Sequence, residues 1–185
     1  TLASSSPRRR ELLEQIMVSY AVEAIDIDES HQAGETPEQY VKRLALEKAR
    51  AGYEKIPDRP ALGSDTMVVL GQSLLGKPQN REMAIEMLSR LSGQRHQVMT
   101  AVAMVNGKQE KCLINISEVE FARLSQQQIN DYWETGEAEG KAGAYGIQEF
   151  IGLIGIKHIE GDFYNVVGFP MQRFWGELQI LLKGH

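Results

Sequence analysis

Three consecutive arginines near the N-terminus, Arg8, Arg9 and Arg10, are the first residues whose type and position suggest chemistry. The segment around them predicts a helix with Ser6 at the N-cap and Pro7 in the first turn. The apolar residues that follow at helical spacing are Leu12, Leu13, Ile16 and Met17. Exposed cations in a first turn oppose the helix dipole, and each costs about 0.3–1 kcal/mol. Because guanidinium groups and helix N-termini both bind phosphate, the cluster favours a phosphate site over a merely solvated helix start.

An aspartate inside an apolar run is the second candidate. The segment GSDTMVVL places Asp65 in a predicted buried strand, where an unpaired carboxylate is costly. One interpretation is that Asp65 caps a turn between Gly63 and Thr66. The other is that it works beside a polyphosphate, where a carboxylate holds a divalent metal or accepts a proton from attacking water. The residues alone leave both interpretations open.

Other charged residues have plain structural explanations. Lys48 lies on the apolar face of a predicted helix, and snorkelling of its long side chain accounts for that position. Asp26, Asp28 and Glu29 are typical of a solvated acidic loop. The segment GQSLLGKP has P-loop spacing up to Lys77, but Pro78 replaces the hydroxyl residue that would bind Mg²⁺. A P-loop is therefore rejected, and the role of Lys77 stays open.

The segment KAGAYGIQ combines Lys141, Tyr145 and Gln148 with small residues. Its glycines, Gly143 and Gly146, either form turns or let the backbone approach a flat ligand. In the second case Gln148 offers both a donor and an acceptor to the edge of a base.

Composition excludes several classes of protein. The 185 residues carry a formal net charge of −5, which argues against a nucleic-acid-binding surface. No apolar stretch has the length of a membrane span, and the four histidines lack zinc-ligand spacing. The single cysteine, Cys112, excludes a disulfide within the chain and favours a reducing compartment, so we expect a cytoplasmic protein.

Helical and strand patterns alternate along the chain and predict an α/β (mixed α+β) fold, a mixed sheet with helices on its faces, in one domain over residues 1–185. Helices are predicted in the segments 36–55, 80–93, 125–134 and 171–182. The segment 20–29 is predicted as a strand that runs into an acidic loop, and strands are predicted in 60–78 and 96–124, the last with a hairpin turn at Asn106 and Gly107. The segment 139–170 is predicted as glycine-punctuated strand and loop.

Taken together, these segments resemble the Maf family of nucleoside triphosphate pyrophosphatases. The resemblance rests, in chain order, on LASSSPRR, IDES, RLALEKA, GSDTMV, GKP, LSGQRHQVMTAVA, KAGAYGIQ and NVVGFP. It implies an elongated mixed sheet with two lobes around a central cleft, similar to the inosine triphosphate pyrophosphatase fold. It also implies cleavage between the α and β phosphates, giving a monophosphate and pyrophosphate with Mg²⁺ or Mn²⁺.

The resemblance assigns roles to particular residues. Asp65 is expected to be the general base or a metal ligand, and Glu29 is expected to assist with metal or water. The expected substrate-binding residues are Ser6, Arg8, Arg9, Glu29, Lys48 and Lys77. Arg8, Thr66 and Gln148 match the subfamily similar to dTTP/UTP pyrophosphatases, whereas a sister subfamily that prefers 7-methyl-GTP differs at these places. Two departures, Arg10 as a third cation and Phe169 in place of leucine, lie outside the expected chemistry.

Three alternatives accompany this interpretation. A nucleotide-binding regulator of cell division or septum formation would not need a water-activating carboxylate. An enzyme directed at dUTP or inosine triphosphate would use the same chemistry on another base. A nucleic-acid-binding module is disfavoured by the acidic charge. The resemblance further implies a homodimer, with no membrane and no nucleic acid as partners.

Overall fold

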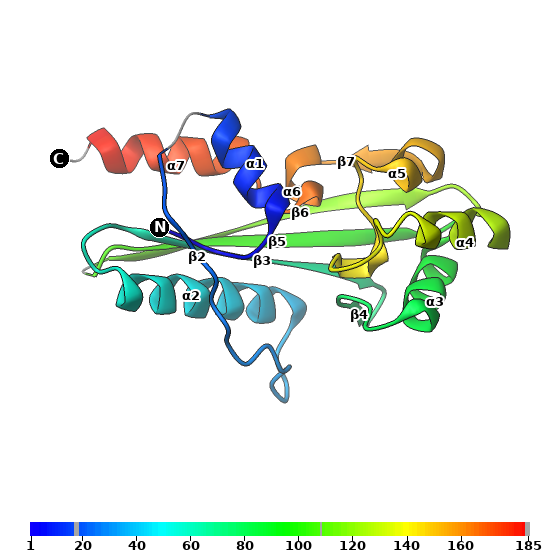
Figure 1. Cartoon of the computed structure of the whole chain (residues 1–185), viewed down its shortest axis with the longest axis horizontal. Coiled ribbons are helices and arrows are strands. Elements are labelled where there is room, and N and C mark those ends of the chain that lie inside the picture. The colour runs from blue at the N-terminus through cyan, green and yellow to red at the C-terminus, as the bar shows by residue number, and fades with distance from the viewer. Residues whose placement is uncertain (17–18, 108, 184–185) are drawn as a thin grey trace. The chain divides into compact units, whose positions relative to one another are not determined.

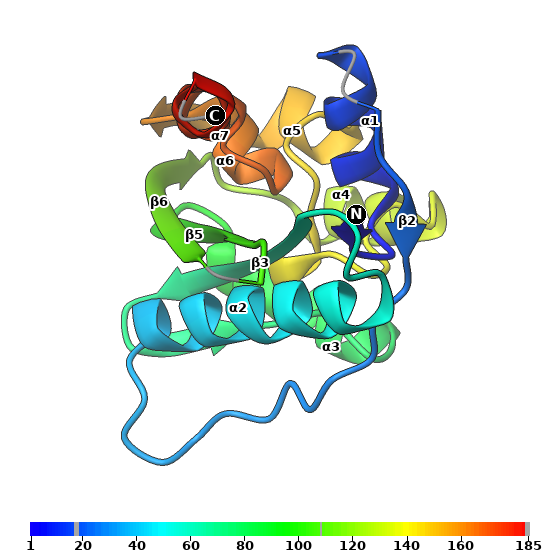
Figure 2. The same ribbon diagram turned by 90° about the vertical axis from the view of Figure 1, so that its left-hand side faces the viewer.

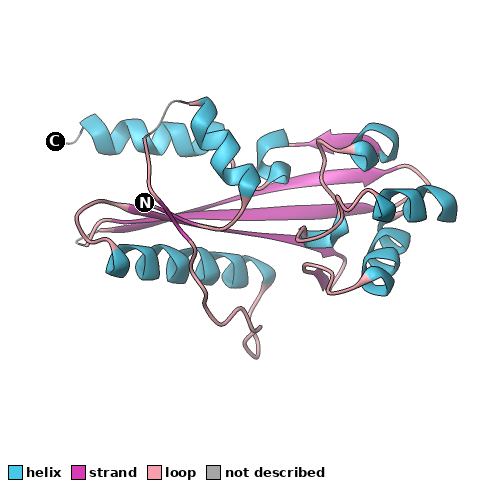
Figure 3. Ribbon diagram, viewed as in Figure 1, coloured by secondary structure: helices cyan, strands magenta, loops and turns pink. Residues whose placement is uncertain are grey.

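The computed structural model describes residues 1–16, 19–107 and 109–183, so Met17 lies outside the described residues. Its strands are β1 (Leu2–Ala3), β2 (Val22–Glu23), β3 (Ala61–Leu70), β4 (Ser73–Leu75), β5 (Arg95–Val105), β6 (Glu110–Phe121) and β7 (Ile156–Glu160). Its helices are α1 (Pro7–Gln15), α2 (Pro37–Lys55), α3 (Arg81–Leu91), α4 (Gln126–Glu134), the 3₁₀ turn η1 (Ala142–Ala144), α5 (Phe150–Gly155), α6 (Phe163–Val167) and α7 (Met171–Lys183). Figure 3 colours helices and strands separately.

The strands of the described ranges form one seven-stranded mixed sheet. The order is β2-β1-β3-β5-β6-β7, and β4 pairs with β3 off this path. Strand β1 runs parallel to both β2 and β3, whereas β3 with β4 and β6 with β7 are antiparallel. Helices flank the sheet, so the predicted mixed α/β fold class is confirmed (Figure 1).

Contacts divide the chain into two compact units. Unit 1 comprises Thr1–Asp65, Thr100–Asn115 and Gly168–His185, and unit 2 comprises Thr66–Met99 and Ile116–Val167. Strands β3, β5 and β6 therefore contribute residues to both units. The single domain over residues 1–185 stays a prediction.

In unit 1, α2 packs directly on the backbone of β1 and β3 because small residues line the contact. A Cβ atom added to Gly63 of β3 would lie 2.1 Å from the carbonyl oxygen of Ala45 and 2.5 Å from the backbone nitrogen of Ala49. A Cβ on Gly52 would lie 2.7 Å from Cβ of Ala3. In Figures 1 and 2, α2 covers one face of the strands of this unit, while α1 and α7 lie on the other. This close approach fixes the α2 residues that face β3.

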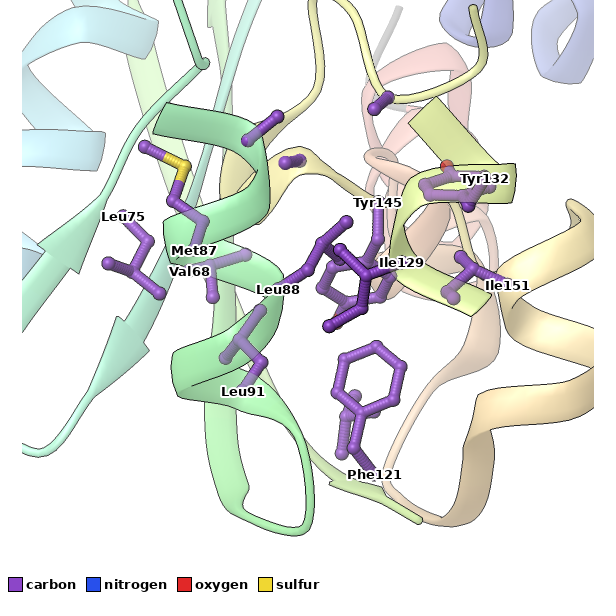
Figure 4. Packing of buried hydrophobic residues seen from close by; sticks show 14 of the residues in the cluster. Val68, Leu75, Met87, Leu88, Leu91, Phe121, Ile129, Tyr132, Tyr145 and Ile151 are labelled. Carbon is purple, nitrogen blue, oxygen red and sulfur yellow. The ribbon is translucent and has the colours of Figure 1, made fainter. Parts of the chain in front are cut away.

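In unit 2, a hydrophobic cluster packs α3 and α4 against β3, β5 and β6. Its buried members labelled in Figure 4 are Val68, Leu75, Met87, Leu88, Leu91, Phe121, Ile129, Tyr132, Tyr145 and Ile151. Tyr145 comes from the segment after η1, so the core of this unit extends into the glycine-rich segment of the sequence.

Local sequence signals predicted most helix ends. Thr36 and Gln39 form a complete capping box at the start of α2, and Asn80 accepts a hydrogen bond from the backbone N–H of Met83 at the start of α3. Gly71 and Gly93 adopt positive φ values of 59° and 71°, as expected for the tight turn and the helix stop.

One predicted segment is confirmed and another is wrong. In residues 20–29 a short strand, Val22–Glu23, runs into an irregular acidic segment, as predicted. The segment 139–170 contains the short helices α5 and α6 as well as β7. Helices of five or six residues are too short to show a helical period, and the glycines of α5 conceal it further.

The Asn106-Gly107 turn lies between β5 and β6 as predicted. Gly107 has a φ of 83°, and the backbone N–H of Asn106 donates to the carbonyl of Gln109 over 3.1 Å. Among the described residues, no helix combines the length and the apolar character needed to cross a membrane.

Candidate active site

A buried lysine bridges two carboxylates in unit 1. The Lys48 ammonium on α2 lies 2.7 Å from Oδ1 of Asp65 on β3 and 2.6 Å from Oε1 of Glu29. Lys48 and Asp65 are both buried, whereas the Glu29 side chain is 44% exposed. The snorkelling interpretation of Lys48 is therefore wrong, since its ammonium is held inside by two carboxylates. The turn-cap interpretation of Asp65 is also wrong, because the residue lies within a continuous strand.

The packing of α2 on β3 explains how Lys48 and Asp65 meet. Lys48 is flanked by Ala49 on α2, and Gly63 lies two residues before Asp65 on β3. The missing side chain of Gly63 brings the helix backbone onto the strand. Lys48 on the helix thus lies within 2.7 Å of the Asp65 carboxylate on the strand, and the ion pair satisfies a buried charge that would otherwise be costly.

The acidic segment that carries Glu29 is tied to α2. The Tyr40 hydroxyl donates to the carbonyl of Glu29 over 2.8 Å, and the Arg43 guanidinium donates to the carbonyl of Ser30 over 3.0 Å. Burial, together with the nearby charges of Asp65 and Glu29, raises the pKa of Tyr40 to about 12, so the hydroxyl stays a donor at neutral pH. Glu29 is thus fixed from its own backbone as well as through Lys48.

A bidentate ion pair between Arg43 and Glu35 also fixes this segment. Arg43 donates from Nε to Oε1 of Glu35 over 2.7 Å and from its Nη2 to Oε2 over 2.9 Å. Hydrogen bonds from Arg43 are the main reason that the pKa of Glu35 falls to about 2. No local sequence pattern marks Tyr40, Arg43 or Glu35 as functional, because their contacts depend on the path of an irregular segment.

Of the predicted arginines, Arg9 has the most defined surroundings. Its Nε donates to the carbonyl of Gly168 over 3.0 Å, and its Nη1 donates to Oγ of Ser4 over 3.3 Å. Burial is the main cause that lowers the pKa of Arg9 to about 10, and the charge of Arg8 acts in the same direction. Asp65 opposes this shift, which places the Arg9 guanidinium within electrostatic reach of the carboxylates.

The other residues at this helix start are less constrained. Ser6 occupies the N-cap of α1 as predicted, but its side chain makes no capping hydrogen bond. The backbone N–H of Ser6 instead donates to Oγ of Ser4 over 3.2 Å. Arg10 donates to the carbonyl of Ser5 over 3.2 Å on an exposed face. Ser4, which sequence reasoning missed, therefore orders both the backbone before α1 and the Arg9 side chain.

Three predicted residues belong to unit 2. Thr66 directly follows Asp65 in β3 and is half-buried, Lys77 follows β4 and is exposed, and Gln148 is exposed just before α5. The structure brings Glu29, Lys48 and Asp65 together in unit 1, with Arg9 nearby. Thr66, Lys77 and Gln148 lie on separate segments of unit 2.

Within KAGAYGIQ, two of the three polar candidates turn into the protein. Lys141 is buried and lies 2.8 Å from Oε1 of Glu149. The Tyr145 hydroxyl is 2.7 Å from Nε2 of His96, and both residues are buried. Burial lowers the pKa of His96 to about 4, so the ring is neutral at pH 7. Gln148 is therefore the exposed polar side chain of this segment that is left to meet a ligand.

The carboxylates of Asp65 and Glu29 suit a metal that is shared with phosphate oxygens. They converge on one cation, which is the Lys48 ammonium in this structure. No group of three or more His, Cys, Asp or Glu side chains that could hold a metal occurs among the described residues. Mg²⁺ is commonly bound by one or two carboxylates together with substrate phosphates, so two carboxylates without a full cage fit that use.

The chain matches a known protein family and its members over nearly its whole length. The family model described as Maf-like protein matches residues 1–181. A protein of Pseudoalteromonas atlantica named dTTP/UTP pyrophosphatase is 49% identical over 92% of this chain and 90% of its own length. Proteins with the same name from Symbiobacterium thermophilum (49% identical, 93% and 88% covered) and Bacteroides thetaiotaomicron (44% identical, 97% and 94% covered) are similar to it as well.

Proposed function

Because the chain belongs to the family of Maf-like proteins, we propose that it hydrolyses dTTP and UTP to the monophosphate and pyrophosphate. The relatives that are named dTTP/UTP pyrophosphatase support this substrate class. The observation that carries the proposal is the buried cluster of Lys48 with Asp65 and Glu29. A buried lysine that bridges two carboxylates, beside an arginine-rich helix start, suits the hydrolysis of a phosphoanhydride.

The cations bind and neutralise the triphosphate. A triphosphate carries about four negative charges at neutral pH, and its hydrolysis depends on positioning and on charge stabilisation. Arg8 and Arg9 bind phosphate oxygens at the N-terminus of α1, with the Ser6 side chain as a further donor. Lys48 adds a point charge to the phosphates, and the resemblance assigns the same role to Lys77 of unit 2. The carbonyl of Gly168 and the hydroxyl of Ser4 hold the Arg9 side chain in its conformation.

Asp65 accepts a proton from the attacking water. Its position in a buried strand fixes the carboxylate, and the Lys48 ammonium holds Oδ1 of this carboxylate at 2.7 Å. A divalent ion, Mg²⁺ or Mn²⁺, held by Asp65 and Glu29 would supply further neutralisation of the phosphates and polarise the scissile bond. Glu29 is the more exposed of the two carboxylates and orients water or metal from the solvent side.

Residues of unit 2 recognise the base. Gln148 offers a donor and an acceptor to the pyrimidine edge, and its exposure leaves the amide available for this contact. The resemblance adds Thr66 of unit 2 and Arg8 of unit 1 to the residues that distinguish the dTTP/UTP subfamily from the one that prefers 7-methyl-GTP.

The decisive test is pyrophosphate release with Mg²⁺ from dTTP, UTP, CTP, GTP, ITP and 7-methyl-GTP. We expect release from dTTP and UTP, and its loss in Asp65→Asn. Asp58→Asn, which changes an exposed aspartate of the same unit, is the matched control and should retain activity. If the wild type binds nucleotides but releases pyrophosphate from none of them, the proposed enzymatic function is wrong, and the nucleotide-binding regulator is the remaining interpretation.

The homodimer and the cytoplasmic location follow from the resemblance and from the single cysteine. Exposed apolar side chains on α5 and α6 provide a surface of the kind that dimers bury; they include Phe150, Leu153, Ile154, Phe163 and Tyr164. Sedimentation analysis of the purified protein tests the dimer.

A further inference from the structure

An ion pair joins the two ends of the segment that carries Gln148. Lys141 stands at its start and Glu149 at its end, and the ammonium lies 2.8 Å from Oε1 of Glu149. The second oxygen, Oε2, accepts a hydrogen bond over 2.8 Å from the hydroxyl of Tyr132 on α4. The same hydroxyl accepts over 3.2 Å from the backbone N–H of Gly146, in the middle of the segment. One carboxylate and one phenol thus contact the start, the middle and the end of the segment.

The backbone of this segment has an unfavourable conformation that its surroundings must maintain. Gly143 and Ala144 adopt φ values of 67° and 61°, and an L-residue with a side chain seldom adopts such a value. The N–H of Gly143 donates over 3.0 Å to the carbonyl of Gly76, the residue before Lys77. The buried ring of Tyr145 anchors the centre of the segment in the core of the unit (Figure 4). A segment with these constraints would rearrange if its anchors were removed.

Gly146 leaves space for the Glu149 carboxylate. A Cβ atom at Gly146 would lie 2.5 Å from both Cδ and Oε2 of Glu149. Gly146 has no positive φ, so this space, and not an unusual backbone conformation, explains the glycine. The glycine in KAGAYGIQ thus serves a contact inside the protein, where the sequence had left open a turn or the approach of a flat ligand.

We propose that Lys141, Glu149 and Tyr132 are positioning residues that set base selectivity through Gln148. Gln148 is exposed and directly precedes Glu149 in the chain. The contacts of the Glu149 carboxylate therefore also fix the backbone from which the Gln148 amide projects. An amide presents a donor on one side and an acceptor on the other, and it discriminates thymine or uracil from cytosine only when its placement is fixed. This inference rests on the proposed function, in which Gln148 contacts the base.

The test compares kcat/KM for dTTP with kcat/KM for dCTP in a set of variants. Gln148→Ala establishes how much of the selectivity depends on the amide. Glu149→Gln removes the ion pair, and Tyr132→Phe removes the bridging hydroxyl with little change in shape. Lys157→Met is the matched control, since Lys157 of β7 forms an exposed ion pair with Glu120 at 2.7 Å in the same unit.

We expect Glu149→Gln and Tyr132→Phe to lower the dTTP/dCTP selectivity about three- to tenfold, mainly through KM for dTTP. Lys157→Met should leave the ratio unchanged. In the Gln148→Ala background, Glu149→Gln should cause no further loss of selectivity, because both changes act through the same amide. Gly146→Ala should reproduce the effect of Glu149→Gln without altering any charge.

The outcomes separate the inference from the function on which it rests. If Gln148→Ala leaves selectivity unchanged, the base-recognition role of Gln148 is wrong, and the inference is overturned with it. If Gln148→Ala abolishes selectivity while folded Glu149→Gln and Tyr132→Phe keep it, the inference alone is overturned. Hydrogen exchange of the amides at 142–148 provides a readout that needs no substrate, and faster exchange in Tyr132→Phe than in Lys157→Met is expected. Should Glu149→Gln fail to fold, unchanged selectivity and exchange in Tyr132→Phe would still overturn the proposal.

Discussion

Two buried lysines, one in each unit, differ in the balance of charge around them. Lys48 and Lys141 are almost equally buried, with exposures of 7% and 8%. Lys48 has two carboxylate partners, Asp65 and Glu29, and the Arg9 guanidinium lies within electrostatic reach of both. Lys141 has one carboxylate partner, Glu149, and donates its other hydrogen bond to the carbonyl of Glu137.

The carboxylate partners of the two lysines also differ in their exposure to solvent. Glu29 is 44% exposed, whereas the Glu149 side chain is only 17% exposed, and its second oxygen is occupied by the Tyr132 hydroxyl. The first cluster therefore has carboxylate capacity to offer to a metal or a water, and the second is a closed pair. Burial of a lysine is common to both, so the surplus carboxylate and its contact with solvent are what indicate a reactive site.

The largest expected effect is the loss of catalysis in Asp65→Asn. We expect dTTP hydrolysis to fall by a factor on the order of 10³, because the general base is lost. We expect the free energy of unfolding to change by less than about 1.5 kcal/mol, because Lys48 keeps Glu29 as an ion-pair partner. Steady-state kinetics and urea denaturation measure the two effects. A stability loss as large as the loss in transition-state stabilisation would contradict the assignment of Asp65 to catalysis.

For Lys141→Met we expect a large loss of stability and a small change in kcat, the reverse of Asp65→Asn. Removing the ammonium that pairs with Glu149 leaves a largely buried charge without this partner, which costs about 3–5 kcal/mol in the free energy of unfolding. The kcat of the folded fraction should change far less than in Asp65→Asn. Urea denaturation of Lys141→Met beside Lys157→Met tests this, and equal stabilities for the two variants would show that Lys141 is not a structural anchor.

What the sequence revealed about these two clusters depended on the range of the signals. Asp65 was found because an acidic residue in an apolar strand is itself unusual. Lys48 was misinterpreted because its partner Asp65 is 17 residues away, and a helical face does not show what packs against it. Glu29 became a candidate only through the family resemblance. Glu149 was not singled out, because its pairing with Lys141 depends on how the intervening segment folds.

The same distinction applies to the fold. Helix caps such as the Thr36–Gln39 box and the Asn106-Gly107 turn are set by neighbouring residues, and both were predicted. The short helices α5 and α6 depend on packing and were missed. The acidic segment after β2 was predicted as a loop, but its particular path depends on the distant side chains of Tyr40 and Arg43 and could not be predicted.

Acid should destabilise unit 2 through His96. The pKa of this buried imidazole is lowered from 6.5 to about 4, mainly by burial. Below pH 6.5 the unfolded chain therefore binds a proton that the folded chain does not bind until about pH 4. Stability is complete above pH 6.5 and falls as the pH approaches 4, by roughly 3 kcal/mol in total.

The variants His96→Gln and His158→Gln test this pH dependence by urea denaturation at pH 7 and pH 5. The first should lose this contribution to the pH dependence, and the second, which changes an exposed histidine on β7, should retain it. If the free energy of unfolding has the same pH dependence in the wild type and in His96→Gln, His96 is protonated in the folded protein as readily as in the unfolded chain. The Tyr145 contact would then be as compatible with a charged ring as with a neutral one.

The smallest of these expected effects tests how the Lys48 cluster is held. Gly63→Ala places a Cβ atom 2.1 Å from the carbonyl of Ala45, which forces α2 away from β3 and lowers the free energy of unfolding by about 2–3 kcal/mol. The Lys48–Asp65 distance should lengthen, and dTTP hydrolysis should fall even in the folded protein. Gly176→Ala on α7 is the matched control in the same unit, since a Cβ there meets nothing within 4 Å. Because alanine is the better helix former, the control should gain up to about 1 kcal/mol. A folded Gly63→Ala protein with full activity would show that the Lys48–Asp65 pair does not depend on the close approach of α2 to β3.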